Sequence, residues 1–447
     1  MNDEMLVDHR DVGAVFRRLS LPYGISMAGD QLLTIVDTIV IGSMGPVALA
    51  GATAATTVFV ALTFTVIGYM SGCGIICAQR IGAGDMDGFG RTVRAGMLVP
   101  LAAAIAVSVL ATFGSHWILH AMVGALPSAN AGASYLAVRA FSTIPIAFTG
   151  IFITALGAAG HQRLAVRVLA LINSVHIPLL LVLALGWGTH HPLGIPGAGI
   201  SSLLSEGIAA IYATWYVWVR PQYRVFSRST LDLRLAVRSA VLGTPEAVFL
   251  FAMMLPDAVI VGLLAPLGAL RVAAFRALVI VSDLTFIVPI PLQSAIQTVV
   301  GQRIGAGDID GAIAFFHRAR RQAVWITTAT ALGAAALAWP AAYAFTLNWA
   351  VANVAAAPLA AHMATLPIKG WAMTSMAPIR ASGDTAFSML VGILTSVLVI
   401  PAAFVFIRVF GFGLWGVPLA WIVAWGARSI VTGMKLRTGS WTRRAAL

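Results

Sequence analysis

The segment QRIGAGDMDG at residues 79–88 returns almost unchanged as QRIGAGDIDG at residues 302–311. The two copies agree at nine of ten positions and lie 223 residues apart in a chain of 447 residues. Glycines allow the chain to reverse, and an aspartate can cap the helix that follows, so each copy is typical of a turn between two helices. The repetition predicts that the chain is built from two related halves.

The composition places these halves in a membrane. Hydrophobic residues make up 59% of the chain, charged residues only 10%, and the mean hydropathy is +0.91. A soluble domain carries about 25% charged residues, whereas a membrane-spanning helix needs about 20 mostly apolar residues. Runs such as VPLAAAIAVSVLATF at 99–113 are continuously apolar rather than alternating as in a barrel strand. The sequence therefore predicts an all-α polytopic membrane protein.

The apolar runs divide the chain into twelve predicted transmembrane helices, in two lobes of six. The predicted spans are 19–42, 52–77, 92–114, 134–156, 164–187, 196–219, 238–264, 272–298, 321–346, 358–379, 385–408 and 413–434. We expect a cytoplasmic N-terminal segment, an N-lobe, a cytoplasmic linker, a C-lobe and a cytoplasmic tail, at residues 1–18, 19–219, 220–237, 238–434 and 435–447.

A second pair of matching segments supports the repeat. VDTIVIGSMGPVAL at 36–49 corresponds to PDAVIVGLLAPLGAL at 256–270, which places Asp37 opposite Asp257. With six spans in each half, equivalent loops face the same side of the membrane. This is a parallel internal repeat, an arrangement that suits alternating access to a site near the middle of the bilayer.

The basic residues orient the predicted helices. The net charge is +12, and most lysines and arginines fall in the N-terminal segment, in the connections after even-numbered spans and in the tail. Basic loops stay on the cytoplasmic side. We therefore expect an inner (plasma) membrane protein with both termini in the cytoplasm, and the basic excess indicates topology, not a nucleic-acid partner.

Several segments together resemble the multidrug and toxic compound extrusion (MATE) family over essentially the whole chain. They are VDTIVIGSMGPVALAG at 36–51, LINSVHIP at 171–178, LLAPLGALRVAAFR at 263–276 and both copies of the repeated loop. The resemblance implies twelve helices in two lobes. It also implies export of a small organic molecule in exchange for protons or sodium ions, with no cofactor.

The strongest candidate for ion coupling is Asp37, a carboxylate in the middle of the first span. In one branch of the family a first-helix aspartate carries the coupling proton, and Asn173 matches the asparagine that partners this acid. Asp257 is a further candidate as the repeat mate of Asp37. The alternative is that Asp37 is a structural, hydrogen-bonded acid.

The chain also departs from the family pattern. Ile177 stands where the proton-coupled branch has an aspartate, and the neighbouring His176 either titrates or simply packs. The sodium-linked branch has acids where Met253 and Lys369 stand. Because sodium needs oxygen ligands, we expect coupling to protons rather than to sodium.

Other polar residues inside the spans are candidates for a substrate cavity. Asp30 lies two helical turns before Asp37, either on the cavity wall or near an aqueous mouth. Lys369 either pairs with an acid such as Asp257 or contacts an anionic group of the substrate, and Arg276 either serves the cavity or neutralises Asp283. The predicted cavity residues are Asp30, His176, Met253, Lys369, Met373 and Arg276, with the two methionines as adaptable wall residues.

Four further residues allow more than one interpretation. Arg139 and Glu206 face either the cavity or another helix. Cys73 and Cys77 lie four residues apart in one apolar span, and we interpret them as packing residues rather than as metal ligands.

The sequence therefore predicts a monomeric, proton-coupled antiporter that exports an amphipathic organic compound, and not an enzyme. Three alternatives remain: a sodium-coupled exporter, a flippase for a lipid-linked precursor and a membrane-embedded enzyme. A flippase predicts several arginines in the cavity. An enzyme predicts paired acids or a nucleophile with its base.

Overall fold

The computed structural model of the chain describes residues 11–124, 126–188, 191–227, 230–253 and 255–442. In the first half the α-helices are α1 (Val12–Val15), α2 (Leu21–Ser43), α3 (Pro46–Gly82), α4 (Met86–Val123), α5 (Pro127–Arg139), α6 (Thr143–Ala158), α7 (Arg163–Leu185) and α8 (Ile195–Trp218). A π-helical segment, Phe16–Ser20, joins α1 to α2.

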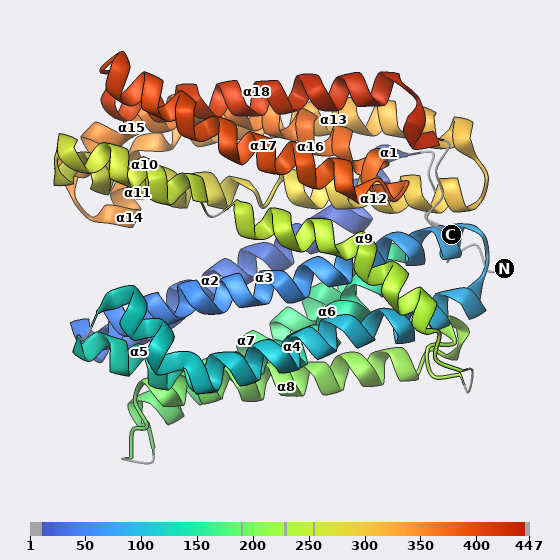
Figure 1. The fold of residues 1–447 in the computed structure, drawn as a ribbon, viewed down its shortest axis with the longest axis horizontal. Coiled ribbons are helices and arrows are strands. Elements are labelled where there is room, and N and C mark those ends of the chain that lie inside the picture. Colours follow the sequence, from blue (N-terminus) through green and yellow to red (C-terminus); the bar gives the residue numbers. More distant parts are fainter. Residues whose placement is uncertain (1–10, 125, 189–190, 228–229, 254, 443–447) are drawn as a thin grey trace. The chain divides into compact units, whose positions relative to one another are not determined.

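The second half is equally helical (Figure 1). Its α-helices are α9 (Leu233–Ala252), α10 (Leu255–Leu264), α11 (Ala269–Thr285), α12 (Pro289–Gly305), α13 (Ile309–Ala336), α14 (Ala338–Thr346), α15 (Trp349–Met363), α16 (Thr365–Ala381), α17 (Thr385–Phe404) and α18 (Gly416–Arg437). The all-α fold class is confirmed.

Each of the twelve predicted spans falls on one α-helix or on two successive α-helices, and in the fourth span a short 3₁₀ segment, Ala140–Ser142, joins the two. Within the described residues, ten helices are long and apolar enough to cross a membrane, or eleven when α13 and α14, which are bent by 64° at their junction, count as one span. The sixth predicted span is α8, a helix of 24 residues that lies outside this set. The polytopic membrane architecture is confirmed.

The described residues form two compact units. The N-unit comprises residues 25–247, and the C-unit comprises residues 11–24 and 248–442. The boundaries fall inside α2 and α9, so each of these helices begins in one unit and ends in the other.

The repeated loop has the same geometry in both units. Asp85 caps α4 by accepting a hydrogen bond from the backbone N–H of Gly88 at 2.7 Å, and Asp308 caps α13 in the same way from Gly311 at 2.9 Å. Arg80 pairs with Asp85, and Arg303 pairs with Asp308. In each copy a glycine with positive φ, 70° and 76° respectively, makes the reversal. The residues that the two copies share therefore form the same turn between two helices in each unit.

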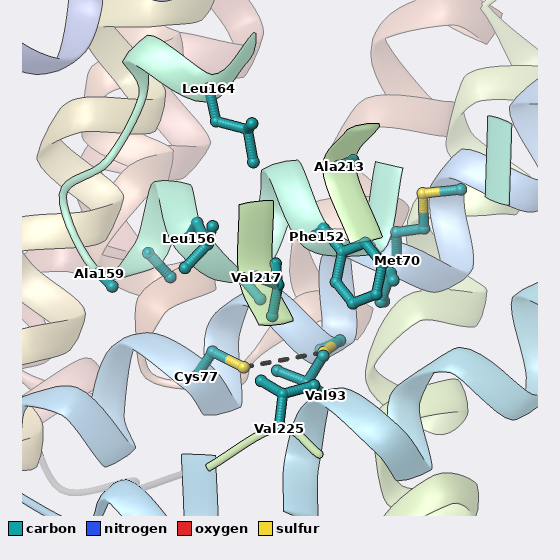
Figure 2. Packing of buried hydrophobic residues seen from close by; sticks show 14 of the residues in the cluster. Met70, Cys77, Val93, Phe152, Leu156, Ala159, Leu164, Ala213, Val217 and Val225 are labelled. Carbon is teal, nitrogen blue, oxygen red and sulfur yellow. Dashed lines mark hydrogen bonds between the residues drawn. The ribbon is translucent and has the colours of Figure 1, made fainter. Parts of the chain in front are cut away.

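The core of the N-unit lies among α3, α4, α6 and α8 (Figure 2). Cys73 and Cys77 are fully buried in it, with their Sγ atoms 3.8 Å apart, and Met70 and Phe152 pack in the same cluster. Burial among apolar side chains is the usual environment of a free cysteine.

The first helical segment belongs to the C-unit. Val15, Phe16 and Leu19 are buried in one cluster with residues of α12 and α13, beside which α1 is drawn in Figure 1. Ser20 donates a hydrogen bond to the carbonyl of Pro291 at 3.1 Å. The segment Val12–Ser20 is therefore held by apolar packing and by a buried hydrogen bond of Ser20.

The first part of α9 packs closely against α3 within the N-unit. A Cβ atom added at Gly68 would lie 2.3 Å from Cα of Ala247, and one at Gly72 would lie 2.0 Å from the carbonyl oxygen of Ser239. Only glycine allows two helix backbones to come this close.

We predict that Gly68→Ala destabilises the protein by about 1–3 kcal/mol, because the added methyl group forces the α3 and α9 backbones apart. The measurement is thermal unfolding of the purified protein in detergent. Gly207→Ala is the matched control, since a Cβ atom at Gly207 in α8 meets no atom within 4 Å. Equal melting temperatures for Gly68→Ala and the wild type would contradict the close packing of these helices.

Candidate functional site

A carboxylate and an imidazole meet inside the N-unit. His176 Nε2 on α7 lies 2.7 Å from Asp37 Oδ1 on α2. The His176 side chain is 2% exposed and that of Asp37 is 21% exposed, so the pair combines a buried imidazole with an accessible carboxylate. The structure therefore brings together two residues that the sequence analysis assigned to different roles.

Asn173 lies one turn before His176 on the same side of α7. A Cβ atom at Gly29 of α2 would lie 3.7 Å from its Nδ2, so Asn173 also approaches α2. Its Oδ1 is buried without a hydrogen-bond partner, and no bond from Asn173 to Asp37 occurs among the described residues. His176 thus takes the contact with Asp37 that the family resemblance suggested for Asn173.

A second polar pair lies nearby in the same unit. Arg139 Nη1 on α5 lies 3.0 Å from Glu206 Oε1 on α8, and both side chains are mostly buried. The Arg139 guanidinium also stacks over Phe59, 4.4 Å from the ring centroid. The two residues therefore face each other.

These two pairs and Asp30 form one electrostatic group. Asp30 interacts with Glu206 and Arg139, and Asp37 also interacts with Arg139. The group contains three carboxylates and one guanidinium, so its net charge is negative when His176 is neutral. Such a site attracts protons and cations.

The C-unit contains a different arrangement around Lys369 on α16. Its side chain is 2% exposed, and Nζ donates a hydrogen bond to Ser282 Oγ on α11 at 3.2 Å. Nζ also lies 4.5 Å from the ring centroid of Phe286 and 5.9 Å from that of Trp425. Asp257 and Asp283 attract Lys369, but neither makes a direct ion pair with it in the described structure.

A cavity of about 70 Å³ adjoins Lys369. Its lining includes Met253 and Asp257, two of the predicted residues, together with three polar residues that the sequence analysis did not select: Ser282, His362 and Trp425. Arg276 and Met373 do not line it. Arg276 acts on both aspartates electrostatically, and Met373 packs with Trp425 in a small buried cluster.

His362 is the residue that sequence reasoning could have found. An ionisable side chain within a predicted span is a candidate functional residue by default, and His362 lies in the tenth span. Ser282 and Trp425 gave no comparable signal, because serine and tryptophan are ordinary residues of transmembrane helices.

Two helical units with ionisable groups inside apolar spans define the class of this protein, a polytopic membrane protein with polar intramembrane sites. The MatE family model matches residues 22–182 and 245–405. The chain therefore belongs to the MatE family, whose members are transporters and not enzymes.

Individual relatives agree with this family. The probable multidrug resistance protein NorM of Pseudomonas syringae pv. tomato is 25% identical over 315 residues, which cover 66% of this chain and 65% of that protein. The probable multidrug resistance protein NorM of Aromatoleum aromaticum is 26% identical over 281 residues, which cover 61% of this chain and 60% of that protein. The chain thus matches less than two thirds of the length of these relatives.

A solved structure shares the fold over nearly the whole chain. A crystal structure of MATE in the bent conformation superposes with a TM-score of 0.90, at 18% identity, and covers 99% of both chains. The arrangement of twelve spans in two lobes is thereby confirmed.

We predict that removing either Arg139 or Glu206 alone destabilises the protein by about 3–5 kcal/mol, because the remaining charge is left buried without its partner. The double variant Arg139→Leu/Glu206→Leu is expected to be more stable than either single variant. The measurement is a double-mutant cycle on thermal unfolding in detergent.

The pair of Arg224 and Asp87, 2.5 Å apart at the surface of the same unit, is the control. Because both of its side chains are exposed, Arg224→Leu should leave the melting temperature unchanged. Additive effects at Arg139 and Glu206 would show that the buried pair is not energetically coupled.

Proposed function

We propose that this protein is a proton-coupled antiporter that exports a small amphipathic organic compound by alternating access. The observation that carries the proposal is the hydrogen bond between His176 and Asp37 at 2.7 Å. The likeness to probable multidrug resistance proteins supports efflux as the direction of transport.

The chemistry of the pair suits proton exchange. A charged Asp37 accepts the hydrogen bond from His176 Nε2, and its partial exposure leaves the carboxylate open to water or cargo. Protonation removes the negative charge and so weakens the attraction of the N-unit group for a cation. A proton and a cationic cargo can thus compete for one site, which is the minimal requirement for antiport.

Other residues have supporting roles in the proposal. Asn173 Oδ1, buried without a partner, can accept a hydrogen bond from a protonated or hydrated acid nearby. Asp30 contributes negative charge to the same group, and Asp257 is the corresponding acid of the C-unit. We further propose that the protein lies in the inner membrane with both termini in the cytoplasm, because basic residues cluster in the predicted cytoplasmic segments.

The test uses proteoliposomes with an acidic interior, in which proton release is followed as cationic, zwitterionic and anionic compounds are added. We predict that at least one compound triggers proton release by the wild type. For Asp37→Asn the rate of proton release should fall to that of protein-free liposomes, because the amide of asparagine does not bind and release a proton as a carboxylate does. Sodium should be neither required nor able to replace the pH gradient.

Asp87→Asn is the matched control, because Asp87 is an exposed carboxylate far from any predicted span centre. It should release protons at the wild-type rate. If Asp37→Asn folds, as judged by its melting temperature, and still exchanges protons like the wild type, Asp37 is not the coupling residue. A rate that follows the sodium gradient instead would favour the sodium-coupled alternative.

A further inference from the structure

The cavity beside Lys369 has the size of a small polar group. It has a volume of about 70 Å³ and is lined mostly by residues of α10, α11, α15, α16 and α18, all within the C-unit. A single buried water needs about 10–15 Å³ of such space. The cavity therefore accommodates several waters or one group of the size of a carboxylate.

The hydrogen bonds around the cavity run in one direction. Lys369 Nζ carries only hydrogen-bond donors, so Ser282 Oγ accepts from it. The hydroxyl hydrogen of Ser282 is then directed to His362 Nε2, 3.0 Å away. In this arrangement His362 is neutral and its second nitrogen, Nδ1, is an N–H donor.

Two of the resulting donors have no acceptor. His362 Nδ1 and Trp425 Nε1 are both buried without a hydrogen-bond partner, and each residue is only 2% exposed. Buried polar groups are almost always hydrogen-bonded, so each exception needs an explanation. The residues that carry these two donors and the buried ammonium of Lys369 all line one cavity. A negatively charged acceptor in it would suit all three groups.

The acids near the cavity limit the charge of that acceptor. Asp257 and Asp283 also line it, and Arg276 attracts both. The two aspartates, Lys369 and Arg276 together have a net formal charge of zero. A single negative charge at the buried donors is therefore tolerated, whereas a phosphate or sulfate with two charges would be repelled by the aspartates.

We propose that this cavity binds one carboxylate group of the cargo, held by Lys369 Nζ, His362 Nδ1 and Trp425 Nε1. Asp283, whose side chain is exposed, and the partly buried Asp257 lie beside the rest of the bound cargo. Their negative charges favour a basic group on the cargo. The cargo is accordingly a carboxylate-bearing or zwitterionic amphipath. The statement that this ligand is the transported cargo rests on the proposed antiport. The binding of a carboxylate in the cavity does not depend on it.

The test measures binding to the purified full-length protein in detergent with N-dansylglycine, a fluorescent amphipath with one carboxylate. Its neutral amide, dansylglycinamide, is the matched probe. Energy transfer from tryptophan to the dansyl group reports binding. The carboxylate probe is expected to bind about tenfold more tightly than the amide, the effect of one charge-assisted hydrogen bond.

Three variants locate the probe. Lys369→Gln should reduce the affinity for N-dansylglycine about tenfold or more and abolish its preference over the amide. Trp425→Phe keeps the ring, removes only the N–H donor and should cause a smaller loss. Lys435→Gln is the control, because Lys435 is the other lysine of the chain and pairs with Asp384 at 2.9 Å, outside this cavity.

Two results would overturn the inference. One is equal affinity of the wild type for the acid and the amide, which needs no variant and so does not depend on how a variant folds. The other is unchanged binding by both Lys369→Gln and Trp425→Phe. Asp37→Asn should bind the carboxylate probe with the affinity of the wild type. Loss of proton exchange and loss of probe binding are therefore distinguishable outcomes.

Discussion

The cost of an unpartnered charge inside an apolar helix shapes both units of this protein. Within a bilayer such a charge persists only where another polar group meets it. In the N-unit His176 meets Asp37 and Glu206 meets Arg139. In the C-unit the buried ammonium of Lys369 is met by a serine hydroxyl and two aromatic faces rather than by a directly paired acid. At His362 and Trp425 this matching is incomplete, and both residues line the cavity beside Lys369.

The internal repeat shows how two copies of one scaffold can acquire different chemistry. The turn between α3 and α4 and the turn between α12 and α13 keep the same aspartate cap and the same arginine partner. The intramembrane acids have diverged, because Asp37 contacts an imidazole whereas its repeat mate Asp257 borders a cavity next to a lysine.

The sequence was sufficient for the architecture but only partly for the sites. Span number, helical class and the repeat follow from apolar run length and from the doubled loop, since both are local in sequence. The partner of Asp37 did not follow, because Asp37 and His176 are 139 residues apart and their contact depends on how α2 packs against α7. Likewise, the donors around Lys369 come from α11, α15 and α18, and no local pattern connects them. Which groups remain unpartnered is visible only once the helices are packed.

The helices α2 and α9 connect these local sites to the whole molecule. The chain before α2 is fixed in the C-unit by Leu19 and Ser20, and the same helix carries Asp37 into the N-unit. In turn, α9 begins against Gly68 and Gly72 of the N-unit and ends in the C-unit. Asp37 therefore lies on a helix whose first residues belong to the C-unit and whose remainder belongs to the N-unit.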